Sequence, residues 1–257
     1  MLTVLSPAKA LDMEPVGHKP TEPIFHDEAN RLAKTARNLP LTDLKALMGL
    51  SDNLATLNRD RYRAFLDAPT KDVVKPAVFA FNGDTYQGLE AKTLSEDALR
   101  YAQDHLRILS GLYGLLRPLD AIQAHRLEMG SRLKTRRGKT LYEYWGDRIA
   151  KALTEQAEAQ GADTLVNCAS VEYYTAADRP ALGLRVVTPT FLENKDGKTK
   201  IVSFYAKRAR GAMARFIMEN RIEDAEALTG FDLGGYRHDP DLSDENKPAF
   251  VRDWPEA

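Results

Sequence analysis

The chain has 257 residues, of which 43% are hydrophobic and 28% charged, and this composition is typical of a globular protein with a hydrophobic core. Its 36 basic and 37 acidic side chains leave a net charge of −1, so any affinity for an anionic partner must come from local clusters of charge. The single cysteine, Cys168, excludes an internal disulfide, fits a reducing compartment and argues against a zinc site built from several thiolates.

The first part of the chain predicts one strand followed by three helices. Leu2–Leu5 is a short apolar run that predicts a buried strand, and the loop after it carries Lys9. Residues 13–25 are rich in Pro and His without periodicity and predict an ordered loop. The three helices are predicted over residues 28–38, from a cap at Thr42 onward, and over residues 53–66. We interpret residues 28–67 as a helical insertion or subdomain.

One strand and two helices are predicted in the middle of the chain. The apolar run at residues 77–81 predicts a strand. Ser95, followed by two acidic residues, predicts the N-cap of a helix that reaches about His105. Residues 141–160 form the longest predicted helix, and Gly161 is its expected C-cap.

The rest of the chain adds strands, a hairpin and two more helices. Strands are predicted over residues 164–169, 184–192 and 200–204, and helices over residues 205–219 and 222–228. Asp196-Gly197, between the last two strands, is a strong hairpin signal, and the tail, rich in Asp, Gly and Pro, is predicted to be a loop. Because strands alternate with helices, we expect an α/β (α+β) fold, a single domain with a mixed sheet flanked by helices.

Residues 47–55 connect two predicted helices and resemble the helix-hairpin-helix motif of DNA repair proteins, in an element that spans about residues 41–66. Ser51 stands where that motif has its second glycine. Such a turn frees backbone N–H groups at the start of the second helix to bind a phosphate, and small residues let the backbone come close. An ordinary capped turn between helices is the alternative. The residues predicted to contact DNA here are Gly49, Leu50, Ser51, Asp52, Asn53 and Ala55.

Basic side chains gather in two segments, residues 126–139 and residues 207–215. On a helix, Lys207 and Arg210 are neighbours at i,i+3, whereas Arg208 and Arg215 share a different face two turns apart. A charged cleft that binds phosphates would carry such clusters. A solvated helix face and an exposed loop would carry them too, and both interpretations stay open.

Polar residues follow several of the predicted strands. In a mostly parallel sheet, the loops beyond the carboxyl ends of the strands converge on a crevice, so Lys9, Glu172 and Lys207 are expected to meet there. They are the candidate catalytic residues, with surface and capping roles as the alternative. The sequence has no standard nucleotide-binding fingerprint and no helical histidine pair for a metal, so we expect neither cofactor nor metal. Cys168 is expected to be a buried structural residue.

Seven segments occur in one order between residues 5 and 231 and together are similar to the bacterial YaaA peroxide-stress protein family. They are LSPAKALD, FNGDTYQGL, HLRILSGLYGLLRPLDAIQAHRLEMG, LYEYWGD, VNCASVEYY, SFYAKRARGAMARFI and LTGF. The resemblance covers nearly the whole chain. Two positions depart from it, because Ala10 stands where the family usually has threonine and Cys168 where it usually has leucine. The second departure disfavours a redox-sensing role for Cys168.

The resemblance implies a cytoplasmic protein, made under hydrogen peroxide stress, that limits damage from unincorporated iron. It also implies binding to double-stranded DNA, bent or damaged duplex included, through the helix-hairpin-helix element and a positively charged cleft in a single α/β domain. For the cleft, the residues that we nominate are Lys9, Arg126, Lys207, Arg208 and Arg210. We find no oligomerisation signature and expect a monomer.

Two other functions remain as alternatives. The first is an enzyme that acts on a nucleotide or nucleic acid in the same basic cleft. It is favoured by the polar residues at the predicted strand ends, which a protein that only binds DNA does not require. The second is direct sequestration of iron, for which the Glu-x-x-His pattern of di-iron helix bundles is absent from the sequence. The N-terminus lacks the features of a signal peptide, and no apolar stretch approaches the length of a membrane span, so we expect a cytoplasmic protein without a membrane anchor.

Overall fold

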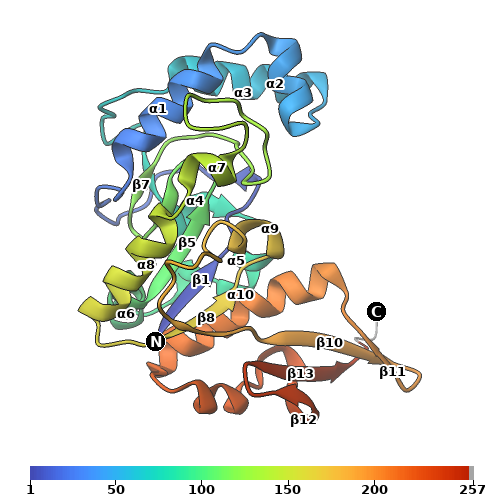
Figure 1. The fold of residues 1–257 in the computed structure, drawn as a ribbon. Helices are drawn as coiled ribbons and strands as arrows, with labels where there is room; N and C mark the ends of the chain where they lie inside the picture. Colours follow the sequence, from blue (N-terminus) through green and yellow to red (C-terminus); the bar gives the residue numbers. More distant parts are fainter. Residues whose placement is uncertain (255–257) are drawn as a thin grey trace.

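The computed structural model describes residues 1–254, and its centre is a five-stranded sheet of order β6-β5-β1-β8-β9 (Figure 1). Four of these strands run parallel, and β6 joins the edge antiparallel to β5. β1 and β8 are buried along their whole length, as expected for central parallel strands covered on both faces. The bounds are β1 (Leu2–Leu5), β5 (Leu106–Ser110), β6 (Gly114–Leu116), β8 (Thr164–Cys168) and β9 (Arg185–Val187).

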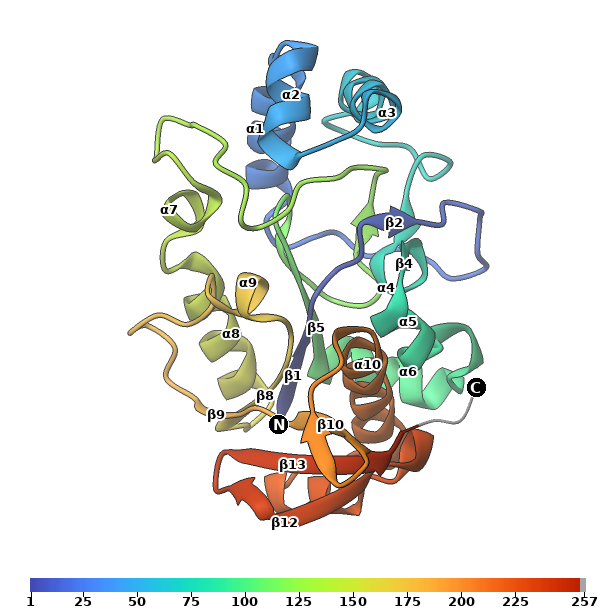
Figure 2. The same cartoon turned by 90° about the vertical axis from the view of Figure 1, so that its right-hand side faces the viewer.

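Helices cover both faces of this sheet (Figure 2). α7 (Leu141–Trp145) and α8 (Arg148–Ala159) lie on one side, and α5 (Asp84–Leu89), α6 (Glu96–His105) and α10 (Ser203–Asn220) lie on the other. Ser95 caps α6 by accepting a hydrogen bond from the Ala98 N–H, as predicted. The predicted mixed α/β fold, with sheets flanked by helices in one compact domain, is confirmed.

The three predicted N-terminal helices are present at one end of the molecule (Figure 1). They are α1 (His26–Arg37), α2 (Leu41–Met48) and α3 (Asp52–Ala64), and α1 buries a stripe formed by Ala29, Leu32, Ala33 and Ala36. α2 begins two residues earlier than expected, because the N-cap is Pro40 and Thr42 lies in the first turn. Whether these helices form a separate subdomain stays a prediction.

A second sheet, of order β11-β10-β13-β12, packs below the first in Figure 1. Asp196 and Gly197 join β10 (Thr190–Lys195) to β11 (Lys198–Lys200) and both have positive φ, 54° and 75°, so the predicted hairpin is confirmed. The prediction of a loop for the tail is wrong. β12 (Arg237–Asp244) and β13 (Lys247–Asp253) form an antiparallel pair, and β12 is largely exposed, so its polar residues gave no strand pattern.

Three further predictions are corrected by the structure. Residues 77–81 are the short helix α4 (Ala77–Ala80) followed by β4 (Phe81–Asn82), because a fully buried apolar run does not distinguish helix from strand. The long helix predicted over residues 141–160 breaks at Gly146, which has φ of 51° and separates α7 from α8. Residues 200–204 are not a strand, since β11 ends at Lys200 and α10 begins at Ser203.

The remaining elements are short. Residues 222–228, predicted as a helix, contain only part of the 3₁₀ helix η2 (Ala225–Gly230). The others are β2 (Ala10–Leu11) paired with β4, β3 (Lys75–Pro76) paired with β7 (Ala121–Ile122), η1 (Ala91–Thr93), α9 (Val171–Tyr174) and η3 (Leu233–Gly235). Within the described residues, none of the helices combines the length and the apolar character needed to cross a bilayer.

Candidate functional site

The carboxyl ends of β1 and β8 lie side by side at the point where the chain changes direction across the sheet. After β1 the next strand added to the sheet is β5, on one side, and after β8 it is β9, on the other. Loops that leave two neighbouring strands in opposite directions leave a crevice between them, and ligands of open α/β sheets bind there. The topology therefore marks this position as the candidate site.

A cavity of about 350 Å³ occupies this crevice, and we call it the switch-point pocket. Its walls come from the loop after β1, the loop before α5, the segment after β8 and one face of α10. Lys9, Glu172 and Lys207, which the sequence predicts to converge, all line it. Arg210 and Asp84 line it as well, so the pocket combines three cations with two carboxylates. The catalytic roles of these residues stay predictions.

The two cations from α10 are those least engaged by the protein. Neither Lys207 nor Arg210 forms an ion pair with another residue between Met1 and Trp254. Lys9 differs, because its Nζ lies 3.2 Å from Glu128 Oε1, to which the Arg126 guanidinium also donates at 2.7 Å. Lys207 and Arg210 are therefore available to an anionic ligand, whereas Lys9 and Arg126 share a carboxylate.

Hydrogen bonds join the loop after β1 to the segment after β8 and to α5. The Ser170 N–H donates to Ser6 Oγ at 2.9 Å, and the Tyr86 hydroxyl donates to the Ser6 carbonyl at 3.1 Å. Glu172 Oε1 accepts a hydrogen bond from the Gly130 N–H at 2.9 Å, which orients the carboxylate. Burial raises the pKa of the Cys168 thiol to about 12, so this residue is protonated at neutral pH and fits the structural role expected of it.

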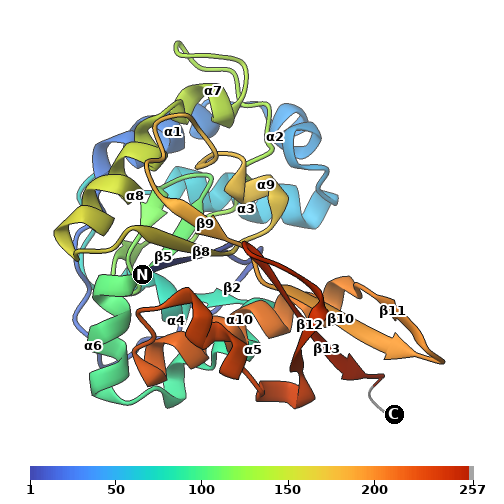
Figure 3. The same ribbon diagram turned by 60° about the horizontal axis from the view of Figure 1, so that its bottom comes forward.

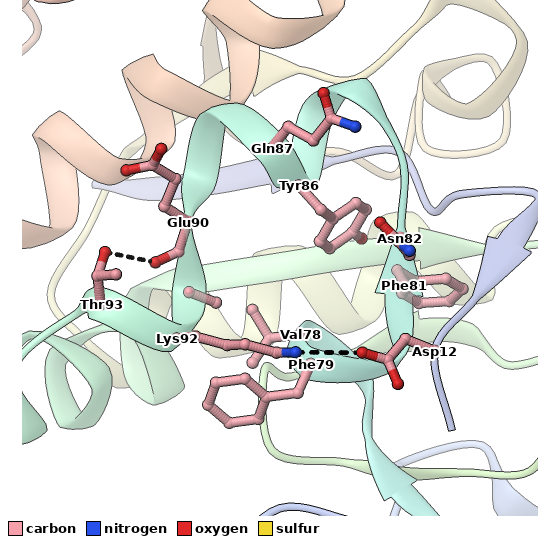
Figure 4. A pocket seen from close by; sticks show the side chains of 11 residues that line it. Asp12, Val78, Phe79, Phe81, Asn82, Tyr86, Gln87, Glu90, Lys92 and Thr93 are labelled. Carbon is pink, nitrogen blue, oxygen red and sulfur yellow. Dashed lines mark hydrogen bonds and ion pairs between the residues drawn. The ribbon is translucent and has the colours of Figure 1, made fainter. Parts of the chain in front are cut away.

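A second cavity, of about 400 Å³, adjoins the switch-point pocket and shares Asn82 with it (Figure 4). Asp12 lies on its rim, where Lys92 Nζ approaches one carboxylate oxygen at 3.1 Å and the buried Lys75 Nζ approaches the other at 3.1 Å. A hydrogen bond from the Glu14 N–H, together with the two lysines, lowers the pKa of Asp12 to about 2. Because Asp12 is paired on both oxygens, this cavity presents a neutralised carboxylate, unlike the switch-point pocket.

Arg126 lies beside the switch-point pocket, next to the buried His125. The Nδ1–H group of His125 donates to the Gln123 carbonyl at 2.8 Å, and the ring packs edge-on against Tyr113. Burial lowers the pKa of His125 to about 4, so the ring is neutral in the folded protein at neutral pH.

When the pH is lowered from 7 to 5, the free energy of unfolding of the wild type is expected to fall by about 2 kcal/mol more than that of a His125→Gln variant. Because the folded pKa of His125, about 4, lies below its unfolded value of 6.5, the unfolded state binds the proton first and stability falls as the pH drops through this window. Urea titrations of both proteins at the two pH values measure the difference. An equal loss in both would contradict the burial of this ring.

The other predicted residues lie elsewhere. Arg208 follows Lys207 on α10 but lines a different cavity, so its role in duplex binding stays a prediction. The predicted hairpin is a three-residue turn between α2 and α3, with Gly49 at φ 59° and Ser51 capping α3 by accepting from the Leu54 N–H. The phosphate-binding role of this turn is likewise untested.

The turn between α2 and α3, the N-terminal end of α10 and the β10–β11 hairpin all lie on one side of the molecule, the side that faces the viewer in Figure 2. The hairpin projects from the body (Figure 3) and carries basic residues that sequence reasoning missed. They are Lys195, Lys198 and Lys200. We call this side the basic face. The Asp196-Gly197 dipeptide beside these lysines predicted a hairpin, but it gave no information on the direction in which the hairpin projects.

Comparisons with known proteins agree on one family. The model of the family described as peroxide stress protein YaaA matches residues 1–242. The chain belongs to this family. It is 63% identical over 254 residues to a UPF0246 protein of Ruegeria pomeroyi, with 99% of each chain covered, and 62% identical over 257 residues to one of Roseobacter denitrificans, again with 99% of each covered. A UPF0246 protein of Dinoroseobacter shibae is 60% identical over 260 residues, covering 100% of this chain and 97% of the relative.

Membership of the YaaA family assigns this chain to the response to peroxide stress. It also confirms the resemblance that the seven sequence segments indicate. Among the described residues there is no group of three or more His, Cys, Asp or Glu side chains that could hold a metal ion.

Proposed function

We propose that this YaaA protein binds double-stranded DNA with its basic face, acting in the cytoplasm and as a monomer, and so limits iron-driven oxidative damage. The observation that carries the proposal is that three separate elements, which carry basic side chains or free backbone N–H groups, lie on the same side of the molecule. The α2–α3 turn, the N-terminal end of α10 and the β10–β11 hairpin are far apart in sequence but lie on that side, and the last two carry Lys207 and Arg210 and the three hairpin lysines. A long, uniformly charged ligand such as a duplex is the partner that all three can contact together.

Each element suits a phosphate backbone. At the start of α3 the Leu54 N–H donates to Ser51 Oγ, whereas the N–H groups of Asp52 and Asn53 have no acceptor within the helix, and the space around the Cβ position of Gly49 is open. Lys207 and Arg210 add unpaired charge, and such contacts do not distinguish bases. Binding is therefore expected to be independent of sequence and sensitive to salt, with bent or damaged duplex as a further preference.

One feature of the switch-point pocket favours a second function, an enzyme that acts on a nucleotide or nucleic acid. Asp84 and Glu172 line the pocket together with its three cations. A site that only neutralises phosphates gains nothing from carboxylates, whereas a catalytic site uses them to move protons or to orient a nucleophile. Lys9 and Glu172 are then the residues expected to act on the substrate, with Lys207 and Arg210 holding its phosphate.

A matched pair of variants at Gly49 tests duplex binding. Both Asn and Asp tolerate the αL conformation, and a Cβ atom at Gly49 meets no atom within 4 Å, so Gly49→Asn and Gly49→Asp should fold equally well. They differ by one negative charge. If a phosphate lies at the turn, Gly49→Asp should bind a fluorescent duplex about tenfold more weakly at low salt, and Gly49→Asn should bind nearly as tightly as the wild type.

Fluorescence anisotropy across a salt series measures these affinities. The slope of log affinity against log salt should be about −0.9 for each phosphate neutralised. Equal affinities for the two variants would remove the turn from the interface. Absence of binding to straight, bent and gapped duplex at low salt would reject duplex binding altogether and leave the enzyme as the function to test.

A further inference from the structure

A cavity of about 540 Å³ lies on the side of α10 opposite the switch-point pocket, between α5, α10, η3 and the end of β13. Its lining includes three aromatic rings, Tyr205, Tyr236 and Trp254, and the guanidinium of Arg208. We call it the aromatic pocket. None of the residues that form the proposed duplex contact at the α2–α3 turn takes part in it, and its volume lies in the range of small-molecule sites.

The rings of this pocket are held in place by a buried ion pair. The guanidinium of Arg252 lies 4.6 Å from the ring centre of Tyr205 and 4.5 Å from that of Tyr236. Arg252 is anchored in turn by Glu193, which is fully buried, lies 3.3 Å from it and accepts a hydrogen bond from the Tyr236 hydroxyl. Arg252 is therefore already engaged by Glu193 and by the two tyrosine rings, and its contact with Tyr205 helps to hold that ring in place.

Tyr205 and Trp254 form a corner, because their ring centres are 5.9 Å apart and their planes meet at 86°. Both side chains are only half-buried, so part of each ring is open to a ligand. The Nζ atoms of Lys195 and Lys200 lie over the Trp254 ring, 4.8 Å and 5.2 Å from its centre, and add positive charge beside it. A planar aromatic ligand can stack on one ring and pack its edge against the other.

Arg208 is the arginine of this pocket that remains available to a ligand. Arg215 is held by Glu219 at 2.6 Å and donates to the carbonyls of Leu89 and Glu90. Arg208 is exposed and makes neither an ion pair nor a side-chain hydrogen bond with any residue from 1 to 254. A planar guanidinium with its donors free is suited to bidentate binding of phosphate.

We infer that the aromatic pocket binds a nucleoside monophosphate unit, whose base stacks in the corner of Tyr205 and Trp254 and whose phosphate pairs with Arg208. Stacking on an aromatic platform beside a basic side chain is how proteins hold unpaired nucleotides, and every base offers a face for it. The unit has two sources, a free nucleotide or an unpaired nucleotide of a nucleic acid strand. The inference does not depend on duplex binding at the basic face.

The two tryptophans of the chain make the pocket directly observable. Trp145 is fully buried, whereas Trp254 lies in the pocket, so a ligand there should quench only the emission of Trp254. Titration of the full chain with AMP is expected to quench part of the tryptophan emission in a saturable way. Trp254→Phe should abolish this quenching while leaving the emission of Trp145 unchanged.

A variant of Arg208 and a control variant on another helix locate the phosphate. Arg208→Ala should weaken AMP binding about tenfold, because a charged hydrogen bond is lost, and should leave the affinity for adenosine unchanged. Lys151→Ala removes a positive charge from exposed α8, across the sheet from α10, and should change neither affinity. Circular dichroism melts confirm that the variants fold.

A single-stranded oligonucleotide separates the two sources of the ligand. Tighter binding of (dA)₁₀ than of AMP would identify an unpaired strand as the ligand, and tighter binding of AMP would identify a free nucleotide. The inference is overturned if neither quenches Trp254, or if AMP binds equally well to the wild type and to Arg208→Ala. Because no duplex is used, these outcomes are independent of the test at Gly49.

Discussion

Replacing Gly211 by alanine is expected to lower the free energy of unfolding by about 3 kcal/mol, although alanine is the better helix former. A Cβ atom at Gly211 would lie 1.7 Å from the carbonyl oxygen of Thr85 and 2.8 Å from the backbone nitrogen of Leu89. Gly88 shows the same contact from the other helix, since its Cβ would lie 1.9 Å from the Arg208 carbonyl oxygen. α5 and α10 thus touch backbone to backbone, and neither backbone can yield cheaply.

The site depends on this contact, because α5 supplies Asp84 and α10 supplies Lys207 and Arg210 to the switch-point pocket. Urea titration of Gly211→Ala measures the loss of stability. Gly17→Ala is the matched control, since a Cβ there meets nothing within 4 Å and the change should stay within about 0.5 kcal/mol. A Gly211→Ala protein as stable as the wild type would show that the two helices do not pack this closely.

Local turn chemistry made some parts of the fold predictable from the sequence. Ser95 followed by acidic residues specifies a helix start, and Asp196-Gly197 specifies a two-residue hairpin, whatever surrounds them. Residues 77–81 are buried on all sides, so their sequence has no alternating pattern. The same apolar residues fit a helix or a strand, and tertiary packing determines which of the two forms. Gly146 breaks a helix that periodicity alone would continue.

The candidate site was predictable where it depends on strand order and not where it depends on the packing of distant segments. Lys9 and Glu172 follow strands that end at one edge of the sheet, so their convergence with Lys207 was expected and the pocket contains all three. The same helical spacing that joins Lys207 to Arg210 turns Arg208 away from them. The aromatic pocket needed β13, which the sequence did not indicate, to bring Trp254 to α10.

Replacing Lys207 and Arg210 together by alanine is expected to weaken duplex binding about 100-fold at low salt and to make the salt slope shallower by about 1.8. The reason is that these two cations have no ion pair among residues 1–254 and face the switch-point pocket, so each is free to neutralise one phosphate. Lys151→Ala is the control for loss of charge, since Lys151 is exposed on α8, across the sheet from α10, and should leave the slope unchanged.

Lys9→Ala then separates the binder from the enzyme. Because Lys9 shares Glu128 with Arg126, its removal should cost a duplex binder only about threefold in affinity. In an enzyme, the same variant should abolish turnover while duplex binding survives, because Lys9 lies in the pocket with Glu172 and no other cation there occupies its position. Anisotropy with the duplex and a turnover assay with nucleotides, run on the same preparation, distinguish the two.

The double variant of Lys207 and Arg210 has its own contradicting outcome. Duplex binding that is unaffected by it would place the DNA outside the pocket and assign the pocket to a small phosphorylated substrate.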